Sequence, residues 1–284
     1  MSRIAYVDGV YGPHRKAAVH IEDRGYQFAD GVYEVIAVRA GKLIDVALHF
    51  TRLHRSLAEL RIEGALSDVP LKFVMREIVR RNSVVNGIVY LQITRGVAPR
   101  DHAFPKAARP VVVVTARRAR TPDPKLARDG ISVITIPDIR WQRCDIKSVS
   151  LLPNVLGKQQ AREAGAYEAW QVDAEGRVTE GTSTNAWIVT GDNLVVTRAA
   201  DHAILNGVAR QALIELIRRE GYGLAERSFT VAEAKSAREA FLTSTTADLL
   251  PVVAIDGRPV ANGVPGSLSE KLRGAYLAHI AESA

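Results

Sequence analysis

The sequence predicts a chain of two α/β domains, each built around a mixed sheet. Three observations support this prediction. β-rich runs and amphipathic helical stretches alternate irregularly along the chain. The 284 residues are 47% hydrophobic, which is enough for two modest cores. The polar segment 118–125 contains two prolines and no apolar period, so we predict domains at 1–117 and 126–284 with this segment as the linker.

The first domain is expected to combine strands with two amphipathic helices. The chain begins with a strand-like segment over residues 1–9. Apolar residues at helical spacing predict helices over residues 48–62 and 69–81. The other expected strands are short runs of β-forming residues. They cover residues 17–21, 33–38, 43–44, 88–94 and 111–116.

The second domain is expected to alternate strands with longer helices. Amphipathic spacing predicts helices over residues 154–163, 208–219 and 268–280. Gly165 and Gly221 follow two of these helices, as is typical of helix C-termini. The expected strands cover residues 131–136, 168–172, 177–180, 186–190, 194–197, 239–243 and 252–255.

Composition excludes several classes of protein. The net charge is +7, but the basic residues are scattered, without stacking aromatics among them, so we predict a solvated surface and not nucleic-acid binding. The longest apolar run, 111–114, is strand-sized, so no membrane contact is expected. Cys144 is the single cysteine, which rules out an internal disulfide and fits a cytoplasmic protein. No metal site is expected.

Lys147 is the first candidate for chemistry. It follows the strand-like segment 134–136, and its neighbours include Cys144, Ile146 and Val149. These apolar neighbours predict a buried segment, and a buried lysine has a lowered pKa and is a poor structural choice unless it is used. The alternative is an exposed loop lysine, the usual fate of this residue type.

Glu180 lies 33 positions after Lys147, at the end of a predicted strand. An enzyme that uses pyridoxal phosphate (PLP) needs an amine to hold the cofactor's aldehyde as a Schiff base. It also needs a carboxylate that keeps the pyridine nitrogen protonated. The pair fits this requirement, although Glu180 could equally be a solvated carboxylate at the end of a hairpin.

Three small, polar stretches predict a phosphate site. Residues 182–184 and 243–246 are rich in hydroxyls, and a glycine turn at 204–207 opens a predicted helix. Helix N-termini bind phosphate readily through free backbone N–H groups. Each stretch is weak by itself, but together they could form a phosphate cup.

The chain resembles the fold-type IV PLP-dependent aminotransferases, and specifically the bacterial D-amino acid aminotransferases. The resemblance implies a homodimer in which a small N-terminal α/β domain and a larger domain with a β-barrel-like sheet hold PLP between them. It is carried in family order by residues 22–34, 94–105, 143–152, 180–185 and 243–246.

The resemblance also implies individual roles for the cofactor-binding residues. Lys147 matches the Schiff-base lysine, Glu180 matches the partner of the pyridine nitrogen, and Leu205 matches the side chain that supports the ring. The family commonly has threonine where this chain has Ala209, which leaves a backbone N–H but no hydroxyl. The expected phosphate contacts are Arg52, Gly207, Val208, Ala209, Ser244, Thr245 and Thr246.

Substrate recognition is expected to depend on Arg100 and His102. They are two apart, so on an extended segment both side chains face one side, and an arginine fork suits a planar carboxylate. The resemblance implies that both reach the site from the partner subunit. Other expected substrate-binding residues are Tyr33, His49, Ser183 and Thr184.

The implied function is transamination between D-amino acids and 2-oxo acids in a ping-pong cycle. An (R)-selective amine transaminase, or a hybrid with a relaxed carboxylate grip, is the main alternative. Branched-chain L-aminotransferases and aminodeoxychorismate lyases resemble the rest of the chain, but they are not expected to carry the Pro-Arg-x-His-x-Phe-Pro loop at 99–105. A basic nucleic-acid-binding protein is the alternative from another class.

Overall fold

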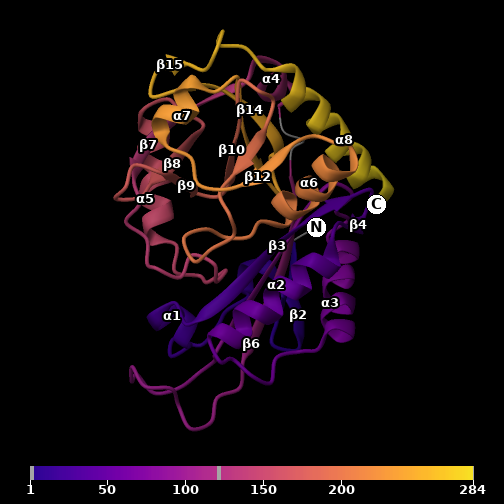
Figure 1. Cartoon of the computed structure of the whole chain (residues 1–284). Helices are drawn as coiled ribbons and strands as arrows, with labels where there is room; N and C mark the ends of the chain where they lie inside the picture. The colour runs from indigo at the N-terminus through magenta and orange to yellow at the C-terminus, as the bar shows by residue number, and fades with distance from the viewer. Residues whose placement is uncertain (1–2, 120–122, 284) are drawn as a thin grey trace. The chain divides into compact units, whose positions relative to one another are not determined.

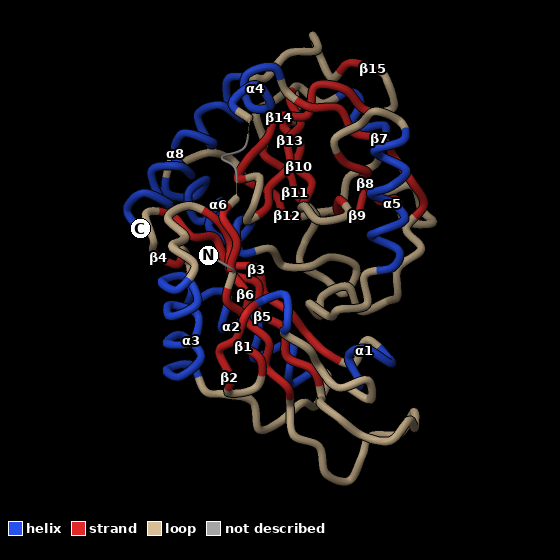
Figure 2. The backbone as a smooth tube through the Cα atoms, turned by 180° about the vertical axis from the view of Figure 1, so that it is seen from behind, coloured by secondary structure: helices blue, strands red, loops and turns tan. Residues whose placement is uncertain are grey.

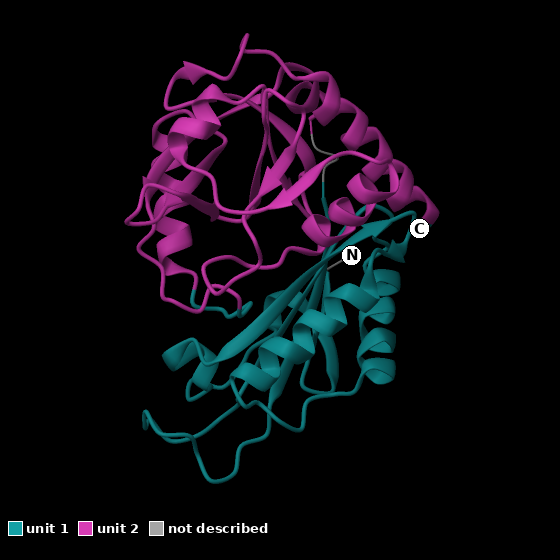
Figure 3. Ribbon diagram, in the orientation of Figure 1, with its two compact units in different colours: residues 1–120, 146–150, 283–284 teal, residues 121–145, 151–282 magenta. Residues whose placement is uncertain are grey.

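A computed structural model describes residues 3–119 and 123–283 of the chain. The chain divides into two compact units (Figure 3). The first comprises Met1–Arg120, Ile146–Ser150 and Ser283–Ala284, and the second comprises Thr121–Asp145 and Leu151–Glu282. The predicted linker at 118–125 includes residues 120–122, which lie outside the described residues, as do residues 1–2 of the first predicted strand. The sequence-based division assigns residues 146–150 to the second domain, whereas the structure groups them with the first unit.

The first unit contains a six-stranded antiparallel sheet with the order β2-β1-β6-β5-β3-β4. The helices α2 (Val46–Glu59) and α3 (Asp68–Arg81) lie together along this sheet (Figure 1). The short helices η1 (His14–Lys16) and α1 (Arg24–Phe28) lie in its connections. The strands are β1 (Ile4–Val7), β2 (Val10–Pro13), β3 (Gly31–Arg39), β4 (Lys42–Leu43), β5 (Gly87–Thr94) and β6 (Val111–Arg118).

The predicted elements of this unit are confirmed with one exception. Both helices and the strands at 33–38, 43–44, 88–94 and 111–116 are present, because each buries an apolar face in one core. The strand predicted at 17–21 is wrong. All five of its residues are exposed, so it has no apolar face to bury against a neighbouring element.

The second unit contains a nine-stranded mixed sheet with the order β12-β11-β10-β13-β14-β7-β8-β9, and β15 pairs with β14. The pairs β7–β8, β7–β14 and β11–β12 are parallel. The sheet curls into a half-barrel, as the fold prediction requires (Figure 2). Its strands are β7 (Ile131–Pro137), β8 (Glu168–Val172), β9 (Val178–Gly181), β10 (Asn185–Val189), β11 (Val195–Thr197), β12 (Leu224–Glu226), β13 (Glu239–Ser244), β14 (Asp248–Ile255) and β15 (Arg258–Pro259).

Helices pack around this sheet. The helix α5 (Leu152–Glu163) contacts β7 and β8, and α6 (Val208–Arg219) contacts β12 and β13. The remaining helices are α4 (Pro124–Asp129), α7 (Val231–Ser236) and α8 (Ser267–Ser283). Among the described residues, no helix is both long and apolar enough to cross a membrane.

Candidate active site

The predicted site residues fall into two groups. Lys147, Tyr33, His49, Arg52, Arg100 and His102 belong to the first unit, the last two on a loop at 97–105. The second unit contains the other predicted residues, namely Glu180, Ser183, Thr184, Leu205, Gly207, Val208, Ala209, Ser244, Thr245 and Thr246.

Lys147 lies on a segment that pairs with the edge of β3. The Tyr33 backbone N–H donates to the Lys147 carbonyl at 3.0 Å, and an isolated antiparallel bridge joins Val32 to Ser148. The Lys147 N–H donates to Ser56 Oγ on α2 at 3.2 Å. The backbone of the lysine is therefore fixed by both a strand and a helix.

The Lys147 side chain lies over an aromatic ring. The antiparallel register sets Lys147 opposite Tyr33, and its Nζ lies 4.2 Å from the centre of the Tyr33 ring. Tyr90 stacks on Tyr33 with 5.7 Å between ring centres. Lys147 is only half-buried, although Ile146 and Ser148 beside it are buried as predicted for this segment. The lysine is thus partly exposed, while its neighbours hold its backbone in place.

A buried charged cluster lies between β3 and α2. Glu34 is fully buried and accepts hydrogen bonds from Arg52 Nε at 2.8 Å and Arg52 Nη2 at 2.7 Å. His49 Nδ1 lies 2.6 Å from an oxygen of the same carboxylate. His49 and Arg52 are three apart on α2, so both project from one face of the helix.

The cluster sets the charge of its members. Burial alone would raise the pKa of Glu34, but the charge and hydrogen bonds of Arg52 and the hydrogen bond from His49 lower it to about 2. Burial lowers the pKa of His49 despite the nearby carboxylate. At neutral pH, Glu34 is therefore ionised and His49 is neutral, with its Nδ1 proton donated to Glu34.

Arg100 and His102 both contact the Phe28 ring at the surface of the first unit. The Arg100 guanidinium lies 4.7 Å from the centre of the Phe28 ring, and the His102 ring lies 5.3 Å from it. Both residues are exposed. The structure thus brings these two predicted residues to a common aromatic platform.

Glu180, in the second unit, is buried among donors. It accepts hydrogen bonds from Arg140 Nη1 at 2.5 Å, from Asn185 Nδ2 at 3.1 Å and from the Leu205 backbone N–H at 3.1 Å. Its side chain is 8% exposed. The interpretation of Glu180 as a solvated hairpin carboxylate is therefore wrong.

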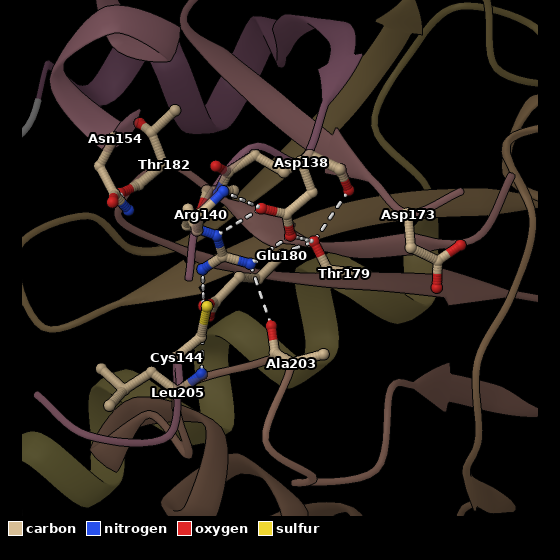
Figure 4. A network of polar contacts seen from close by, with 12 residues as sticks. Asp138, Arg140, Cys144, Asn154, Asp173, Thr179, Glu180, Thr182, Ala203 and Leu205 are labelled. Carbon is tan, nitrogen blue, oxygen red and sulfur yellow. Dashed lines mark hydrogen bonds and ion pairs between the residues drawn. The ribbon is translucent and has the colours of Figure 1, made fainter. Parts of the chain in front are cut away.

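Arg140 connects Glu180 to a second carboxylate (Figure 4). Its Nε and Nη2 donate to Asp138 at 2.9 and 2.7 Å, and Nη2 also donates to the Ala203 carbonyl at 3.0 Å. Burial would lower the pKa of Arg140, but the bonds to Asp138 and the charge of Glu180 raise it. Burial would raise the pKa of Asp138, but its hydrogen bonds and the charge of Arg140 lower it. Asp138 and Arg140 are therefore both charged at neutral pH, and the guanidinium of Arg140 favours the ionised form of Glu180.

Cys144 lies near the same cluster. Burial raises the pKa of the Cys144 thiol to about 12, against the effect of Arg140. The thiol donates a hydrogen bond to the Trp141 carbonyl at 3.1 Å. A thiol that stays protonated at neutral pH is a poor nucleophile.

The turn before α6 is tied to Glu180 through Asn185. Asn185 Nδ2 also donates to the Leu205 carbonyl at 2.9 Å. A Cβ atom on Gly207 would lie 2.1 Å from Asn185 Oδ1, so a larger residue there would displace the Asn185 amide. Gly207 is the N-cap of α6, and no side chain caps this end of the helix. The first backbone N–H groups of α6, from Val208 and Ala209, therefore suit an anion.

The hydroxyl-rich stretch 244–246 lies close to this turn. Thr243 pairs with Asn185 across β13 and β10, which places the end of β13 beside the turn before α6. Ser244 Oγ accepts from the Ala247 N–H at 3.0 Å and lies 3.4 Å from Thr246 Oγ1. Asn185 therefore links the end of β13 to the turn before α6.

The hydroxyl-rich stretch at 182–184 has a different partner. Thr182, Ser183 and Thr184 all direct their hydroxyls at the fully buried Glu168, at 2.5, 3.3 and 3.4 Å. In this structure the hydroxyls of Ser183 and Thr184, predicted to bind substrate, thus stabilise a buried carboxylate.

Comparison with known proteins identifies the family. The model of the family described as amino-transferase class IV matches residues 31–255. The chain belongs to the class IV aminotransferases. Among curated relatives of this aminotransferase, D-alanine aminotransferase of Bacillus licheniformis is 42% identical over 92% of the chain and 91% of the relative. D-alanine aminotransferase of Staphylococcus haemolyticus is 39% identical over 97% of both.

Solved structures resemble this aminotransferase in fold. The branched-chain amino acid aminotransferase of Escherichia coli has a TM-score of 0.91 at 21% identity, covering 99% of this chain and 95% of that chain. The branched-chain aminotransferase of the archaeon Thermoproteus uzoniensis with norvaline has a TM-score of 0.86 at 24% identity, covering 98% of this chain and 94% of that chain. The predicted fold and family are confirmed.

Sequence reasoning missed several buried charged residues. Glu34 is a charged residue within the apolar strand β3, and this contrast was a usable signal. Asp138 and Arg140 follow β7 in a stretch without periodicity, and only their contacts with Glu180 in the folded chain identify them.

Proposed function

We propose that this aminotransferase transfers the amino group between D-amino acids and 2-oxo acids with PLP as its cofactor. The observation that carries the proposal is its identity of 42% and 39% to two proteins named D-alanine aminotransferase. The contacts of Arg100 and His102 with the same ring, that of Phe28, support it from the structure. The single cysteine fits a reducing cytoplasm.

The chemistry of the second unit suits PLP. Glu180 is a buried, ionised partner for a protonated pyridine nitrogen, and Arg140 and Asn185 keep its carboxylate in place. The uncapped N-terminus of α6 and the hydroxyls of 244–246 are donors for a phosphate group. When bound, the cofactor supplies an electron sink for the substrate carbon that loses its proton.

In the first unit, Lys147 would do the proton chemistry. The residue is half-buried, its Nζ lies over the Tyr33 ring, and its backbone is held by β3 and by Ser56. A lysine in this position can hold the cofactor between reactions and then carry a proton from the substrate Cα. Arg52, with two of its nitrogens bonded to Glu34, would present its guanidinium to the phosphate in a fixed orientation.

We propose a homodimer in which Arg100 and His102 grip the substrate carboxylate in the partner's site. Exposed apolar side chains lie in this loop and in the nearby segment 21–26 of the first unit, and such side chains favour association with another protein surface. They are Ile21, Tyr26, Val97 and Phe104. A second copy of the chain would bury them and receive the loop.

Replacing Arg100 with alanine tests the substrate class. Loss of a charge-assisted fork to a carboxylate costs about 1.5–3 kcal/mol, or roughly tenfold to a hundredfold in kcat/KM. We expect this loss for D-alanine and for 2-oxoglutarate, mainly in KM. The amine (R)-phenylethylamine has no carboxylate, so the half-reaction that transfers its amino group to the cofactor should proceed at an unchanged rate. Equal losses on D-alanine and (R)-phenylethylamine would show that Arg100 supports the fold or the dimer instead.

A further inference from the structure

The 97–105 loop is exposed, but the backbone that leads into it is fixed. The Arg24 N–H donates to the Gly96 carbonyl at 2.9 Å, and the Ala98 N–H donates to the Glu22 carbonyl at 3.3 Å. Gly96 has a φ of 98°, and a Cβ atom there would lie 2.0 Å from a backbone oxygen. The loop therefore starts from one defined backbone conformation.

Two buried arginines share one carboxylate beside this start. Arg24 Nε donates to Asp30 at 2.8 Å, and Arg95 donates to it through Nε at 2.7 Å and Nη2 at 3.0 Å. We call these three residues the anchor cluster. The side chains of Arg24, Asp30 and Arg95 are 3%, 11% and 8% exposed, respectively. Burial would raise the pKa of Asp30, but the bonds and charges of the two arginines lower it. The carboxylate thus stays ionised and holds both guanidinium groups in place.

Each arginine of the anchor cluster also holds the loop. Arg24 Nη1 donates to the Asp101 carbonyl at 2.6 Å, and its Nη2 donates to the His102 carbonyl at 3.3 Å. The Arg95 guanidinium lies 3.7 Å from the centre of the Phe104 ring. The loop is therefore attached at its middle by hydrogen bonds and at its far end by a cation–π contact.

The same contacts place the two side chains proposed to grip the carboxylate. Arg24 and Arg100 both lie over the Phe28 ring, at 4.9 and 4.7 Å, and His102 packs against it. Arg24 fixes the backbone of His102 from one side while Phe28 supports its ring. Asp30 itself contacts neither Arg100 nor His102 in any of these bonds, so any effect on them passes through Arg24 and Arg95.

We propose that Asp30 is a positioning residue for substrate recognition. It orders the 97–105 loop through Arg24 and Arg95, and so fixes the direction in which Arg100 and His102 meet a carboxylate. This inference rests on the proposed function of Arg100.

The test is Asp30→Asn, which keeps the size of the side chain and removes its charge. Amide hydrogen exchange of the peptide 97–105, measured without substrate, should become roughly tenfold faster. The KM for D-alanine should rise roughly tenfold, as expected when one charge-assisted bond is lost. The kcat for (R)-phenylethylamine and the visible spectrum of the bound cofactor should not change.

Glu77→Gln is the matched control. Glu77 is also a carboxylate of the first unit shared by two arginines, Arg80 and Arg81, but both are its near neighbours on α3 and neither is bonded through it to the 97–105 loop. It should change neither the exchange rate nor KM. Phe104→Leu is a gentler second variant, because Phe104 is 49% exposed and its loss should not prevent folding. It should loosen the far end of the loop and raise KM in the same direction.

Combining Asp30→Asn with Arg100→Ala separates this inference from the proposed function. If Asp30 acts through Arg100, the double variant should lose little more activity on D-alanine than Arg100→Ala alone. Unchanged exchange at 97–105, or equal losses on D-alanine and (R)-phenylethylamine in Asp30→Asn, would overturn the inference. A failure of Arg100→Ala to discriminate between these two substrates would instead refute the proposed grip, and exchange would still report on Asp30.

Discussion

Arg140 is almost fully buried, and its charge is balanced by Asp138 on one side and Glu180 on the other. Taking such a group out of water is costly unless its partners are well placed. The arrangement leaves Glu180 with a fixed orientation and a full negative charge, which is what a partner for a protonated ring nitrogen needs. Arg140 therefore supports the chemistry we propose for Glu180 without being one of the residues that the sequence identified.

Replacing Arg140 with methionine should destabilise the second unit by about 3–5 kcal/mol, because two buried carboxylates lose their cation. The three tryptophans, Trp141, Trp170 and Trp187, all belong to this unit, so urea unfolding followed by tryptophan fluorescence measures the effect. Arg128→Met is the control. Arg128 makes the same two-point contact with Asp129, but both are exposed, and the unfolding midpoint should not move. Equal midpoints for the two variants would mean that burial of Arg140 has no energetic consequence.

Among the elements, β3 and α2 position the proposed site residues of the first unit. Tyr33 on β3 is paired with the backbone of Lys147, while Glu34, the next residue, points to His49 and Arg52 on α2. Because successive side chains point to opposite faces of a strand, Tyr33 and Glu34 contact different partners.

Glu34→Gln should make the first unit less stable and less sensitive to acid. The folded pKa of Glu34 is about 2 and its ordinary value is 4.5, so its contribution is fully present above pH 4.5 and is lost as the pH falls toward 2. This difference corresponds to about 3 kcal/mol. Hydrogen exchange of α2 between pH 7 and pH 3 provides the measurement. A variant whose α2 protection falls with pH as steeply as the wild type's would contradict this assignment.

The acid response should have a second, separate component. The pKa of His49 is lowered from 6.5, so the unfolded chain takes up this proton first, and stability declines as the pH falls below about 6.5. His49→Gln removes the group that causes this component, so the stability of the variant should not decline in this way below about pH 6.5.

Most elements could be predicted from the sequence because their apolar faces are periodic. The helices α2, α3 and α6 are amphipathic and bury one face, so their predicted bounds differ from those observed by only a few residues. The helices α1, α4 and α7 have five or six residues, too few to show a period. The segment 17–21 contains β-forming residues, so it is predicted as a strand. Its burial depends on its neighbours in space, which the local sequence does not show.

The site could be predicted only where residue type and order carry the signal. Lys147, Glu180 and the glycine turn at 207 stand in recognisable segments. The partners of Glu180 and of Arg52 come from distant parts of the chain, and their importance depends on burial that no local pattern reveals. Ser183 and Thr184 are predicted to bind substrate from their hydroxyl-rich stretch, but their hydroxyls contact the buried Glu168.

For the whole molecule, the proposal that Arg100 acts across a dimer interface can be tested by complementation. Lys147→Ala removes the amine and Arg100→Ala removes the carboxylate grip, so each variant alone should be strongly impaired. In a mixed dimer, one site would combine the intact Lys147 of one chain with the intact Arg100 of the other. Co-expression should form half mixed dimers and restore about a quarter of wild-type activity on D-alanine. Activity no higher than that of the two parents would place Arg100 in the same chain's site.

The choice between D- and L-amino acids is the central claim, because the structural neighbours include branched-chain enzymes while the curated relatives are D-alanine aminotransferases. The most direct test is the initial rate of the purified, PLP-loaded enzyme on D-alanine, L-alanine, L-leucine and (R)-phenylethylamine, each with 2-oxoglutarate. Our account predicts rapid turnover of D-alanine, with the two L-amino acids slower by roughly a hundredfold or more, a difference of about 2.7 kcal/mol in transition-state binding. Turnover of L-leucine that equals or exceeds that of D-alanine would contradict it.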